Sequence, residues 1–405
     1  MKPLTFISSW IILCLIIALI AGCAPQPTPI PSPIPSPIPT YSPSPVATMT
    51  PVPTPVPSLT PTSIPPVLIQ GVDASFLQQI EDAGGKYFDQ GSQMDALQIF
   101  KNHGVNFIRL RIWNDPFIGY NNLAKTLVMA KRVKALQMGL LIDFHYSDTW
   151  ADPGKQTKPA AWTGLSFDQL GQAVHDYTRD VISALKSQGT LPEMVQIGNE
   201  ITSGMLWDDG KVGGANDANW PRFAELLKAG IAGVNDSLSG TEKVLIMLHI
   251  DQGANNQTCR WFLDHIQDLK VPYDLIGVSY YPWWHGEMSD LEANLKDLAE
   301  RYQKPVVVAE TGYPWSLENN DATGNLVTSA TKLLPEFPAT VAGQRSFLLA
   351  EKKVLQSLPG GNGLGIFYWA ADDITTPRFG SVWENVATFD FKGNVLDSLD
   401  VFLGQ

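Results

Sequence analysis

The stretch Met194–Glu200 (MVQIGNE) has the pattern of a buried β-strand that ends in a carboxylate. Its apolar residues alternate with Gln196 and Gly198, which is the two-residue period of a strand. The run Val306–Glu310 (VVVAE) also ends in Glu, after an unbroken apolar series typical of a strand buried on both faces. A carboxylate at the end of a buried strand is unfavourable unless it has a partner or a chemical task. The two glutamates are therefore either a functional pair or two unrelated charges in salt bridges.

Strand-like runs of this kind recur along the chain and alternate with amphipathic, helix-like segments. We expect strands at residues 67–73, 105–112, 139–145, 194–199, 243–250, 274–281, 305–310 and 364–369. We expect helices at residues 93–103, 123–138, 167–188, 220–238, 291–302 and 346–358. This alternation predicts an α/β fold, a (β/α)8 TIM barrel with insertions. The alternative is an open doubly wound sheet, which usually has a Gly-rich phosphate turn after its first strand, and Gly71–Ser75 (GVDAS) is not such a turn.

The composition is that of an acidic chain with a large core. The 405 residues are 44% hydrophobic, and the net charge is −12 at pH 7. An acidic chain argues against a nucleic-acid partner, because phosphate binding requires a basic surface. Cys259 is the only cysteine after Cys23, which leaves no pair for a disulfide in that part of the chain. We expect a packed thiol at Cys259 rather than a nucleophile, because no His motif accompanies it.

The N-terminal residues have the features of a targeting segment. Lys2 precedes the apolar run Trp10–Ile20, and the small residues Ala21 and Gly22 stand before Cys23, so residues 1–22 are expected to be a signal peptide. The segment IAGC resembles a bacterial lipobox, in which the cysteine is lipidated and becomes N-terminal. We expect a protein outside the cytoplasm that is lipid-anchored to a bacterial membrane surface, or secreted if the anchor is not used.

Residues 23–66 are rich in Pro, Ser and Thr and carry no charged residue. Such a segment cannot bury a core, and it is expected to be a disordered, polyproline-rich spacer. This division predicts three parts: a lipoprotein signal peptide at 1–22, the spacer at 23–66 and a barrel domain at 67–405.

In a TIM barrel the active site lies at the C-terminal ends of the strands. Here those ends are rich in polar and aromatic residues, namely Asp73, Arg109, Arg111, Asp143, His145, Tyr146, Asn199, Glu200, His249, Asp251, Tyr280, Tyr281, Glu310 and Trp369. His145, His249 and His285 leave a mononuclear metal hydrolase open. That alternative is poorly supported, because barrel metal hydrolases generally begin with two closely spaced His on the first strand, where this chain has Asp73.

Glycoside hydrolysis fits the strand ends better. One carboxylic acid must protonate the leaving oxygen while a second carboxylate attacks the anomeric carbon or activates water. Glu200 and Glu310 end the predicted fourth and seventh strands and should face each other across the barrel mouth. Several tryptophans offer flat faces for sugar rings, although core packing is the alternative for each: Trp283, Trp284, Trp315 and Trp369.

Several longer motifs stand in order along residues 69–403: GVDAS at 71–75, GVNFIRLRIW at 104–113, FHYSDTWADPGKQ at 144–156, VQIGNEI at 195–201, ETGYPW at 310–315, WEN at 383–385 and FDF at 389–391. Together they resemble glycoside hydrolase family 53, the bacterial arabinogalactan endo-β-1,4-galactanases of the retaining (β/α)8 clan A. The chain departs from the family at Gly312, where Ser is common, and at Ala370–Asp372, where Glu-Pro usually follows the tryptophan. These departures affect the outer subsites more than the catalytic centre.

The resemblance implies an acid/base at Glu200 and a nucleophile at Glu310, which together cleave the galactan side chains of pectin. It also implies that a further set of residues contacts the substrate: Asp73, Arg109, Asp143, Phe144, His145, Tyr146, Asn199, Tyr280, Trp315 and Trp369. We expect a polysaccharide substrate, no organic cofactor and a monomer.

Bacterial relatives can hold a calcium ion between the long loops after strands 7 and 8. The resemblance places the corresponding oxygen donors at Asn319, Asp321, Thr323 (through its carbonyl), Asn325, Ser381 and Glu384. Alternating oxygen donors suit a hard cation. The alternative is an ordinary polar surface loop, since Asn319 stands where an Asp is commoner.

The sequence leaves two rival functions open. One is another clan A activity on mannan, xylan or glucan, against which the motif at 144–156 argues. The other is a non-catalytic, glycan-binding lipoprotein on a barrel scaffold, because a fold does not determine its function. The presence of both Glu200 and Glu310 argues against a purely binding role.

Overall fold

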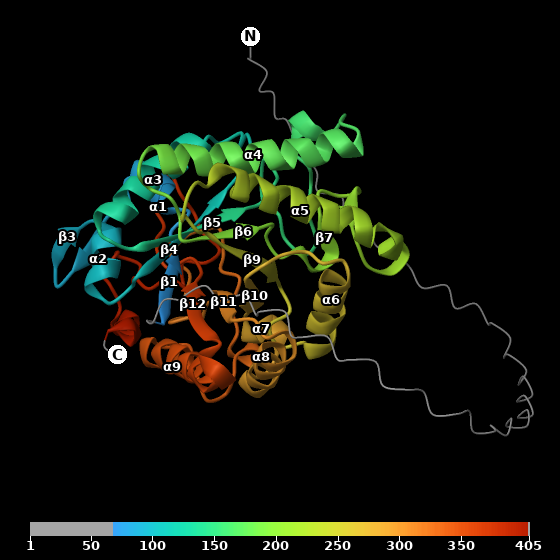
Figure 1. Ribbon diagram of the computed structural model, residues 1–405. Helices are drawn as coiled ribbons and strands as arrows, with labels where there is room; N and C mark the ends of the chain where they lie inside the picture. Colours follow the sequence, from blue (N-terminus) through green and yellow to red (C-terminus); the bar gives the residue numbers. More distant parts are fainter. Residues whose placement is uncertain (1–67, 404–405) are drawn as a thin grey trace, which may run out of the picture. The chain divides into compact units, whose positions relative to one another are not determined.

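The computed structural model describes residues 68–403 (Figure 1). The predicted signal peptide, the lipidation site Cys23 and the Pro-rich spacer lie outside the described residues. Among residues 68–403, no helix is both long enough and apolar enough to cross a membrane. The division of the chain at residues 22 and 66 stays a prediction.

Eight parallel strands close into a barrel in the order β1-β12-β11-β10-β9-β6-β5-β4. Their bounds are β1 (Ile69–Asp73), β4 (Phe107–Ile112), β5 (Gly139–Phe144), β6 (Met194–Ile197), β9 (Leu245–Ile250), β10 (Leu275–Tyr280), β11 (Val306–Thr311) and β12 (Gly363–Tyr368). Each one coincides with a predicted strand to within two residues at either end. The predicted (β/α)8 barrel is therefore confirmed, and the open doubly wound sheet is excluded.

Helices surround the barrel (Figure 1). They are α1 (Leu77–Asp82), α2 (Ala96–Asn102), α3 (Leu123–Ala135), α4 (Phe167–Ser187), α5 (Trp220–Ser237), α6 (Asn256–Asp268), α7 (Pro282–His285), α8 (Met288–Tyr302) and α9 (Val341–Ser357). Local capping defines several starts. The Asn122 side chain accepts the N–H of Lys125 at the start of α3, and Ser166 and Gln169 form a capping box at the start of α4.

Three helices were not predicted, for two different reasons. The helices α1 and α7 contain six and four residues, which is too short for a helical period to appear in the sequence. The helix α6 does have an apolar face, made by Cys259, Phe262, Leu263 and Ile266. Because its first turn is polar, the helical period of this face is not evident in the sequence. The start of α6 is marked only by Asn255, whose side chain accepts the N–H of Thr258. Two small hairpins were also missed: β2 (Tyr87–Asp89) with β3 (Ser92–Met94), and β7 (Gly204–Met205) with β8 (Gly210–Lys211).

The lower part of the barrel is filled with apolar side chains. They form one buried cluster of Ile69, Leu141, Met194, Met247, Leu275, Val307, Ala309, Leu364 and Phe367. Gly71 makes room for this layer, because a Cβ there would lie 2.3 Å from the ring of Phe367. A packed interior of this kind is typical of TIM barrels, and it leaves the C-terminal ends of the strands as the place for a site.

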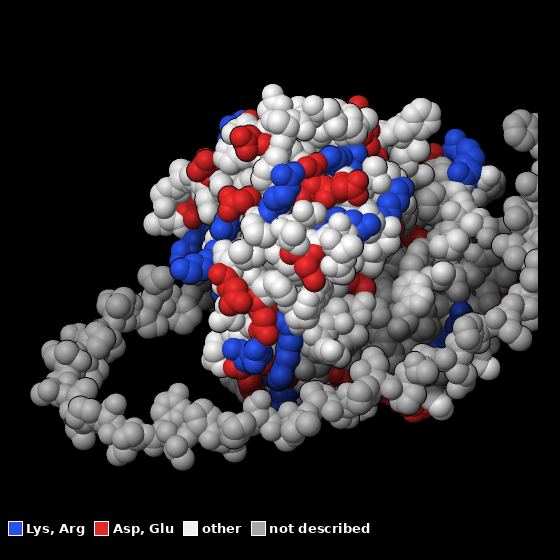
Figure 2. All heavy atoms as spheres, turned by 90° about the vertical axis from the view of Figure 1, so that its right-hand side faces the viewer, with Lys and Arg blue, Asp and Glu red and all other residues white. Residues whose placement is uncertain are grey.

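Acidic and basic side chains are interspersed on the face of the molecule that Figure 2 shows. Lys and Arg do not gather there into a continuous basic surface. Mixed charge of this kind gives a polyphosphate chain little to bind.

Candidate active site

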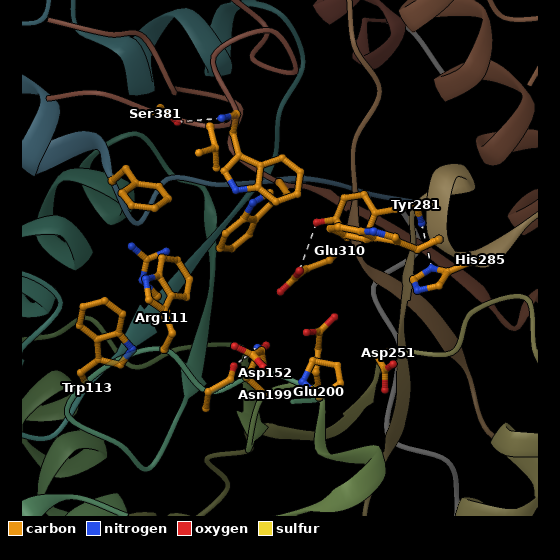
Figure 3. A pocket seen from close by; sticks show the side chains of 18 of the residues that line it. Arg111, Trp113, Asp152, Asn199, Glu200, Asp251, Tyr281, His285, Glu310 and Ser381 are labelled. Atoms are coloured by element: carbon orange, nitrogen blue, oxygen red, sulfur yellow. Dashed lines mark hydrogen bonds between the residues drawn. The ribbon is translucent and has the colours of Figure 1, made fainter. Parts of the chain in front are cut away.

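A cleft of about 910 Å³ opens at the C-terminal ends of the strands (Figure 3). Its wall combines carboxylates, amides and many aromatic rings: Phe76, Arg111, Trp113, Trp150, Asn199, Glu200, Asp251, Tyr281, Trp284, His285, Glu310, Trp369, Phe379 and Trp383. Figure 3 shows the carboxyls of Glu200 and Glu310 pointing toward each other across the cleft. The structure thus brings the two predicted catalytic glutamates together.

A sharp turn of the backbone aims Glu200 into the cleft. The strand β6 ends at Ile197, and Gly198 then has φ 85°. Glu200 itself has φ 47° and ψ 52°, the left-handed region that a non-glycine residue seldom adopts. Such backbone strain gathers at functional sites, where the surrounding structure enforces it. The carboxyl is held by Ser279, whose hydroxyl donates to Oε1 at 2.6 Å.

A β-bulge sets the direction of Glu310 within β11. Val308 pairs with Val278 of β10, but the next pair is Glu310 with Ser279, so Ala309 is the additional residue. The Glu310 carboxyl reaches the cleft and meets two partners. Its Oε1 lies 2.9 Å from Nη2 of Arg109, and its Oε2 accepts the hydroxyl of Tyr281 at 3.2 Å.

Arg109 of β4 connects the polar groups at the base of the cleft and is fully buried. It donates to Asp73 at 2.9 Å and to Asp143 at 2.8 Å, besides its contact with Glu310. It also donates to the side-chain oxygen of Asn199 at 2.9 Å. Burial opposes the charge, but the three carboxylates hold the pKa of Arg109 above its ordinary value. The guanidinium is therefore a permanent cation beside Glu310.

The pKa values of the two glutamates are raised to different extents. Burial, followed by the charges of Glu310 and Asp251, raises the pKa of Glu200 well above its ordinary value. Burial also raises the pKa of Glu310, but the Arg109 guanidinium opposes this rise strongly. Glu200 is thus the group that keeps a proton, and Glu310 is the group that ionises first. An acid/base at Glu200 and a nucleophile at Glu310, the roles that the resemblance implies, would require a separation in this direction, and both roles stay predictions.

His145 supports this arrangement from behind the cleft wall. Its Nδ1 accepts from the indole N–H of Trp113 and from the backbone N–H of Ala151, each at 3.1 Å. Its Nε2 therefore carries a proton and donates to Asp143 at 3.0 Å. Burial opposes ionisation of Asp143, but Arg109 and His145 hold its pKa below the ordinary value. Asp73, Asp143 and His145 act through Arg109 rather than by lining the cleft.

Phe144 and Tyr146 lie away from the cleft, contrary to their predicted contact with substrate. Their rings stack on each other with a centroid distance of 5.5 Å, and both are fully buried. The hydroxyl of Tyr146 pairs with that of Thr178 on α4 at 2.8 Å. The reason is the alternation of β5, which turns Asp143 inward and Phe144 toward the surrounding helices.

Tyr280 and Trp315 also lie outside the cleft. The Tyr280 ring stacks on Phe347 of α9, and its hydroxyl donates to the carbonyl of Gly286 at 2.9 Å. Trp315 packs on Phe391 with a centroid distance of 4.6 Å. The neighbour of Tyr280 along the chain, Tyr281, is the residue whose hydroxyl reaches Glu310.

The aromatic wall of the cleft was largely missed by the sequence analysis. Trp369 lies where it was predicted, at the end of β12, and packs against Phe76, Trp150 and Trp383 at centroid distances of 6.2, 5.9 and 6.3 Å. Those three rings come from loops or from the residue before a short helix. The clustering of aromatic residues within the predicted βα loops is the sequence feature that could have indicated this wall.

Arg111 is part of the same wall. Its guanidinium lies 4.1 Å from the ring centroids of both Phe76 and Trp150. Burial lowers the pKa of Arg111 to about 10. Within residues 68–403, none of its three side-chain nitrogens has a hydrogen-bond partner. Stacking between two rings therefore supplies the main contacts of this cation.

The predicted calcium ligands lie on two loops that touch. Asp321 accepts the backbone N–H of Thr323 at 2.7 Å and that of Ser381 at 3.0 Å. Glu384 accepts the backbone N–H of Asn320 at 2.5 Å. Each carboxylate thus hydrogen-bonds to the backbone of the opposite loop, so both lie between the loops, where a bound ion would have to lie.

The remaining donors fit a cation in part. Asn319 accepts the N–H of Asn325, whereas the side-chain oxygen of Asn325 is buried and has no partner among the described residues. No group of three or more His, Cys, Asp or Glu suited to a metal occurs in residues 68–403. A calcium site here would depend on amide, hydroxyl and carbonyl oxygens around two carboxylates, which is an accepted ligand set for this ion.

A TIM barrel with two facing carboxyls at the ends of its fourth and seventh strands, set among aromatic rings, has the architecture of a glycoside hydrolase. Comparison with known proteins agrees with this class. Residues 69–402 match the model of Glycosyl hydrolase family 53, and the chain belongs to this family.

Relatives and solved structures match over most of the chain. A protein of Niallia circulans described as uncharacterised is 48% identical over 339 residues, which cover 82% of this chain and 92% of that one. The arabinogalactan endo-β-1,4-galactanase of Cellvibrio japonicus is 37% identical over 344 residues, covering 82% of this chain and 89% of that one. The solved GH53 catalytic domain of Ignisphaera aggregans has a TM-score of 0.78 at 39% identity and covers 85% of this chain and 99% of that one.

The site predicts that Tyr281→Phe weakens catalysis through Glu310. The lost hydroxyl donates to the Glu310 carboxylate, and a hydrogen bond to a charged group contributes about 1.5–3 kcal/mol, so kcat/KM should fall by roughly 10- to 100-fold. Initial rates on a polysaccharide that the unchanged protein cleaves provide the measurement.

Tyr280→Phe is the matched control. It removes the hydroxyl of the adjacent tyrosine, which donates to Gly286 and does not reach the cleft. Turnover should stay close to that of the unchanged protein. Equal losses in the two variants would contradict the assignment of Tyr281 to the nucleophile.

Proposed function

We propose that this chain is an endo-acting, retaining β-1,4-galactanase that cleaves the (arabino)galactan side chains of pectin. The observation that carries this proposal is the pair Glu200 and Glu310 in one cleft, where Glu310 is in direct contact with the Arg109 cation and Glu200 is not. Membership of family 53 and galactanase relatives such as that of Cellvibrio japonicus supply the substrate class. The cleft also reaches the surface, since Ile118 and Trp284 on its wall are half exposed, which suits a long chain.

In the first step Glu310 attacks the anomeric carbon as a carboxylate. Arg109 keeps it ionised and Tyr281 fixes its second oxygen. The bond between the anomeric carbon and the leaving oxygen breaks, and Glu200 transfers its proton to that oxygen. The high pKa of Glu200 is what keeps this proton available near neutral pH.

In the second step water cleaves the glycosyl ester on Glu310. Esterification removes the negative charge of Glu310, which had raised the pKa of Glu200. The pKa of Glu200 therefore falls, and after giving up its proton Glu200 stays a carboxylate that can act as a base. Glu200 then takes a proton from water, the water oxygen bonds to the anomeric carbon, and Glu310 departs as a carboxylate. Two inversions at the anomeric carbon give net retention. The proposal requires carboxyls about 5–5.5 Å apart.

The two rival functions predict different behaviour. A purely glycan-binding protein has no need of two buried carboxyls with separated pKa values, because such pairs are unfavourable without a chemical role. Another β-1,4-glycanase would use the same catalytic pair, and only the substrate separates it from a galactanase.

Incubation of the protein with linear β-1,4-galactan, β-1,4-mannan and β-1,4-xylan tests the function. Galactan alone should be shortened to oligosaccharides, and early products should include intermediate lengths, as endo cleavage requires. Time-resolved NMR should show the β-anomer first. Preferential cleavage of mannan or xylan would refute the substrate, and a first-formed α-anomer would refute the retaining mechanism.

Glu310→Ala is the control for the nucleophile. Turnover should fall by several orders of magnitude, because no covalent intermediate can form. Azide should restore part of it by entering the space of the lost carboxylate, with an α-galactosyl azide as product. Activity of Glu310→Ala close to that of the unchanged protein would contradict the assigned role.

We also propose that one calcium ion joins the two loops that carry Asp321 and Glu384. The support is the hydrogen bonding between these loops and the buried, unpartnered oxygen of Asn325. A chelator should lower the melting temperature, and added Ca²⁺ should restore it by mass action. Asp321→Ala should abolish this response, with Mg²⁺ as the control ion. An identical melting curve with and without chelator would leave the loops as ordinary surface.

We propose further that Cys23 is lipidated and anchors the protein to a bacterial membrane outside the cytoplasm. The support is the sequence alone: an apolar run, two small residues and a cysteine, followed by a Pro-rich spacer. Cys23→Ala should abolish lipid labelling and move galactanase activity from the membrane fraction to the soluble fraction. A Cys23→Ala protein that still carries lipid would refute the anchor.

A further inference from the structure

A row of hydrogen bonds leads from Arg109 to the acid/base. Arg109 Nε donates to Gln196 Oε1 at 3.3 Å, and Gln196 Nε2 lies 2.9 Å from His249 Nδ1. His249 Nε2 lies 2.9 Å from Ser279 Oγ, which donates to Glu200 Oε1 at 2.6 Å. The four side chains behind Glu200 are all 0% exposed, so bulk water does not compete for these bonds. Of this row, the two catalytic steps use only Arg109 and Glu200, the two ends.

The orientation of the Gln196 amide determines which atoms of the row donate and which accept. A guanidinium can only donate, so the Gln196 atom that faces Arg109 must be the amide oxygen. The amide nitrogen of Gln196 then faces His249 as a donor. Asn199 is fixed in the same way, because its side-chain oxygen faces Arg109 and its nitrogen donates to the carbonyl of Ala151 at 2.8 Å.

The tautomer of His249 follows from these donors. Its Nδ1 meets the amide N–H of Gln196 at 2.9 Å and the backbone N–H of Glu200 at 3.4 Å. The oxygen of Asn199 also lies 3.1 Å from this nitrogen, but two donors outweigh one acceptor. Burial, with the nearby charge of Arg109, holds the pKa of His249 well below its ordinary value, so the ring is neutral. Its single proton is therefore on Nε2.

The proton on His249 Nε2 determines that the Ser279 hydroxyl donates to Glu200. Its oxygen accepts the Nε2–H of His249, so among residues 68–403 its own proton has only Glu200 Oε1 as an acceptor. Because Oε1 is engaged as an acceptor, the acid proton of Glu200 belongs on Oε2. That is the oxygen left free to meet the substrate.

We propose that Ser279 and His249 are a positioning pair that keeps Oε1 of Glu200 inward and its transferable proton on Oε2. The inference deepens the proposed function and rests on it, because it concerns the same acid/base. Neither residue touches the reacting atoms, and both act through Glu200.

The pair does not itself transfer a proton. In the first step the O–H bond at Oε2 breaks, the leaving oxygen takes the proton, and the Ser279 hydroxyl stabilises the new carboxylate at Oε1. In the second step Oε2 accepts a proton from water. The Ser279 proton stays on Oγ and the His249 proton on Nε2 throughout. One orientation of Glu200 thus serves both steps.

The charges around Glu200 determine the sign of the expected pH effect. Glu310 and Asp251 raise its pKa, whereas Ser279 and Arg109 lower it; the Tyr281 hydroxyl and the neutral His249 complete its titratable surroundings. Removal of the Ser279 hydroxyl takes away a donor that favours the carboxylate, so the pKa of Glu200 rises. Glu200 must be protonated for the first step. The alkaline limb of the kcat/KM profile therefore moves to higher pH.

The test is the pH profile of Ser279→Ala on whichever glycan the unchanged protein cleaves. The alkaline limb should move up by roughly 1 to 2 pH units, the value of a hydrogen bond to a charged group. The rate should also depend more steeply on the leaving group, because the proton is no longer confined to Oε2. Ser279→Cys, with a weaker donor of similar size, should shift the limb less, and it replaces Ser279→Ala if that variant does not fold.

Ser398→Ala is the matched control. It removes another buried serine hydroxyl, one that donates to Gln344 far along the chain from the catalytic glutamates. It should change the melting temperature but leave the alkaline limb in place. A measurement without turnover adds to this: the carboxyl ¹³C signal of Glu200, assigned with Glu200→Gln, should titrate at higher pH in Ser279→Ala.

Two results would overturn the positioning pair. One is an alkaline limb in Ser279→Ala that coincides with that of the unchanged protein, whatever the loss in rate. The other is an unchanged titration of Glu200 by NMR. A wrong substrate assignment would give a different result: the unchanged protein would leave galactan intact and cleave another glycan. The pH profiles of Ser279→Ala and of the unchanged protein would then be compared on that glycan.

Discussion

One buried guanidinium holds together the groups on which the cleft depends. Arg109 of β4 contacts Asp73 of β1, Asp143 of β5, Gln196 of β6 and Glu310 of β11, so a single side chain joins five strands at the barrel mouth. A buried cation is strongly unfavourable without such partners, and so are three buried carboxylates without the cation. The arrangement is therefore cooperative: the position of Glu310 and the integrity of this end of the barrel depend on the same contacts.

The fold could be predicted from the sequence because its periodic signals are strong. Each barrel strand is a run of four to six residues in which apolar side chains recur, and the main helices have amphipathic faces. Elements without such a signal were missed, such as α7, whose bounds depend on Pro282 and the Tyr281–Gly286 turn. The hairpins β2–β3 and β7–β8 are short pairings whose stability comes from the surrounding loops rather than from their own residues.

The site could be predicted where it depends on strand ends, and less well elsewhere. Asp73, Glu200 and Glu310 lie at or just beside the C-terminal ends of buried strands, and Arg109 lies inside β4. A charged side chain in or beside a buried strand is unusual enough to indicate a function. Phe144 shows the limit of that reasoning, because adjacent residues of a strand face opposite sides and only Asp143 points inward. Trp150 and Trp383 come from loops, whose paths depend on tertiary contacts that no local pattern records.

Two chemically identical side chains acquire different roles here through their neighbours alone. Glu310 and Glu200 both sit in the cleft and both lose water on folding, which raises the pKa of each. Glu310 has a cation and a phenol as partners, whereas Glu200 faces the carboxylates of Glu310 and Asp251 and receives only a neutral hydroxyl. The bulge at Ala309 and the left-handed turn at Glu200 create this asymmetry, because they decide which carboxyl meets Arg109. Backbone geometry thus determines the proton distribution that acid/base chemistry requires.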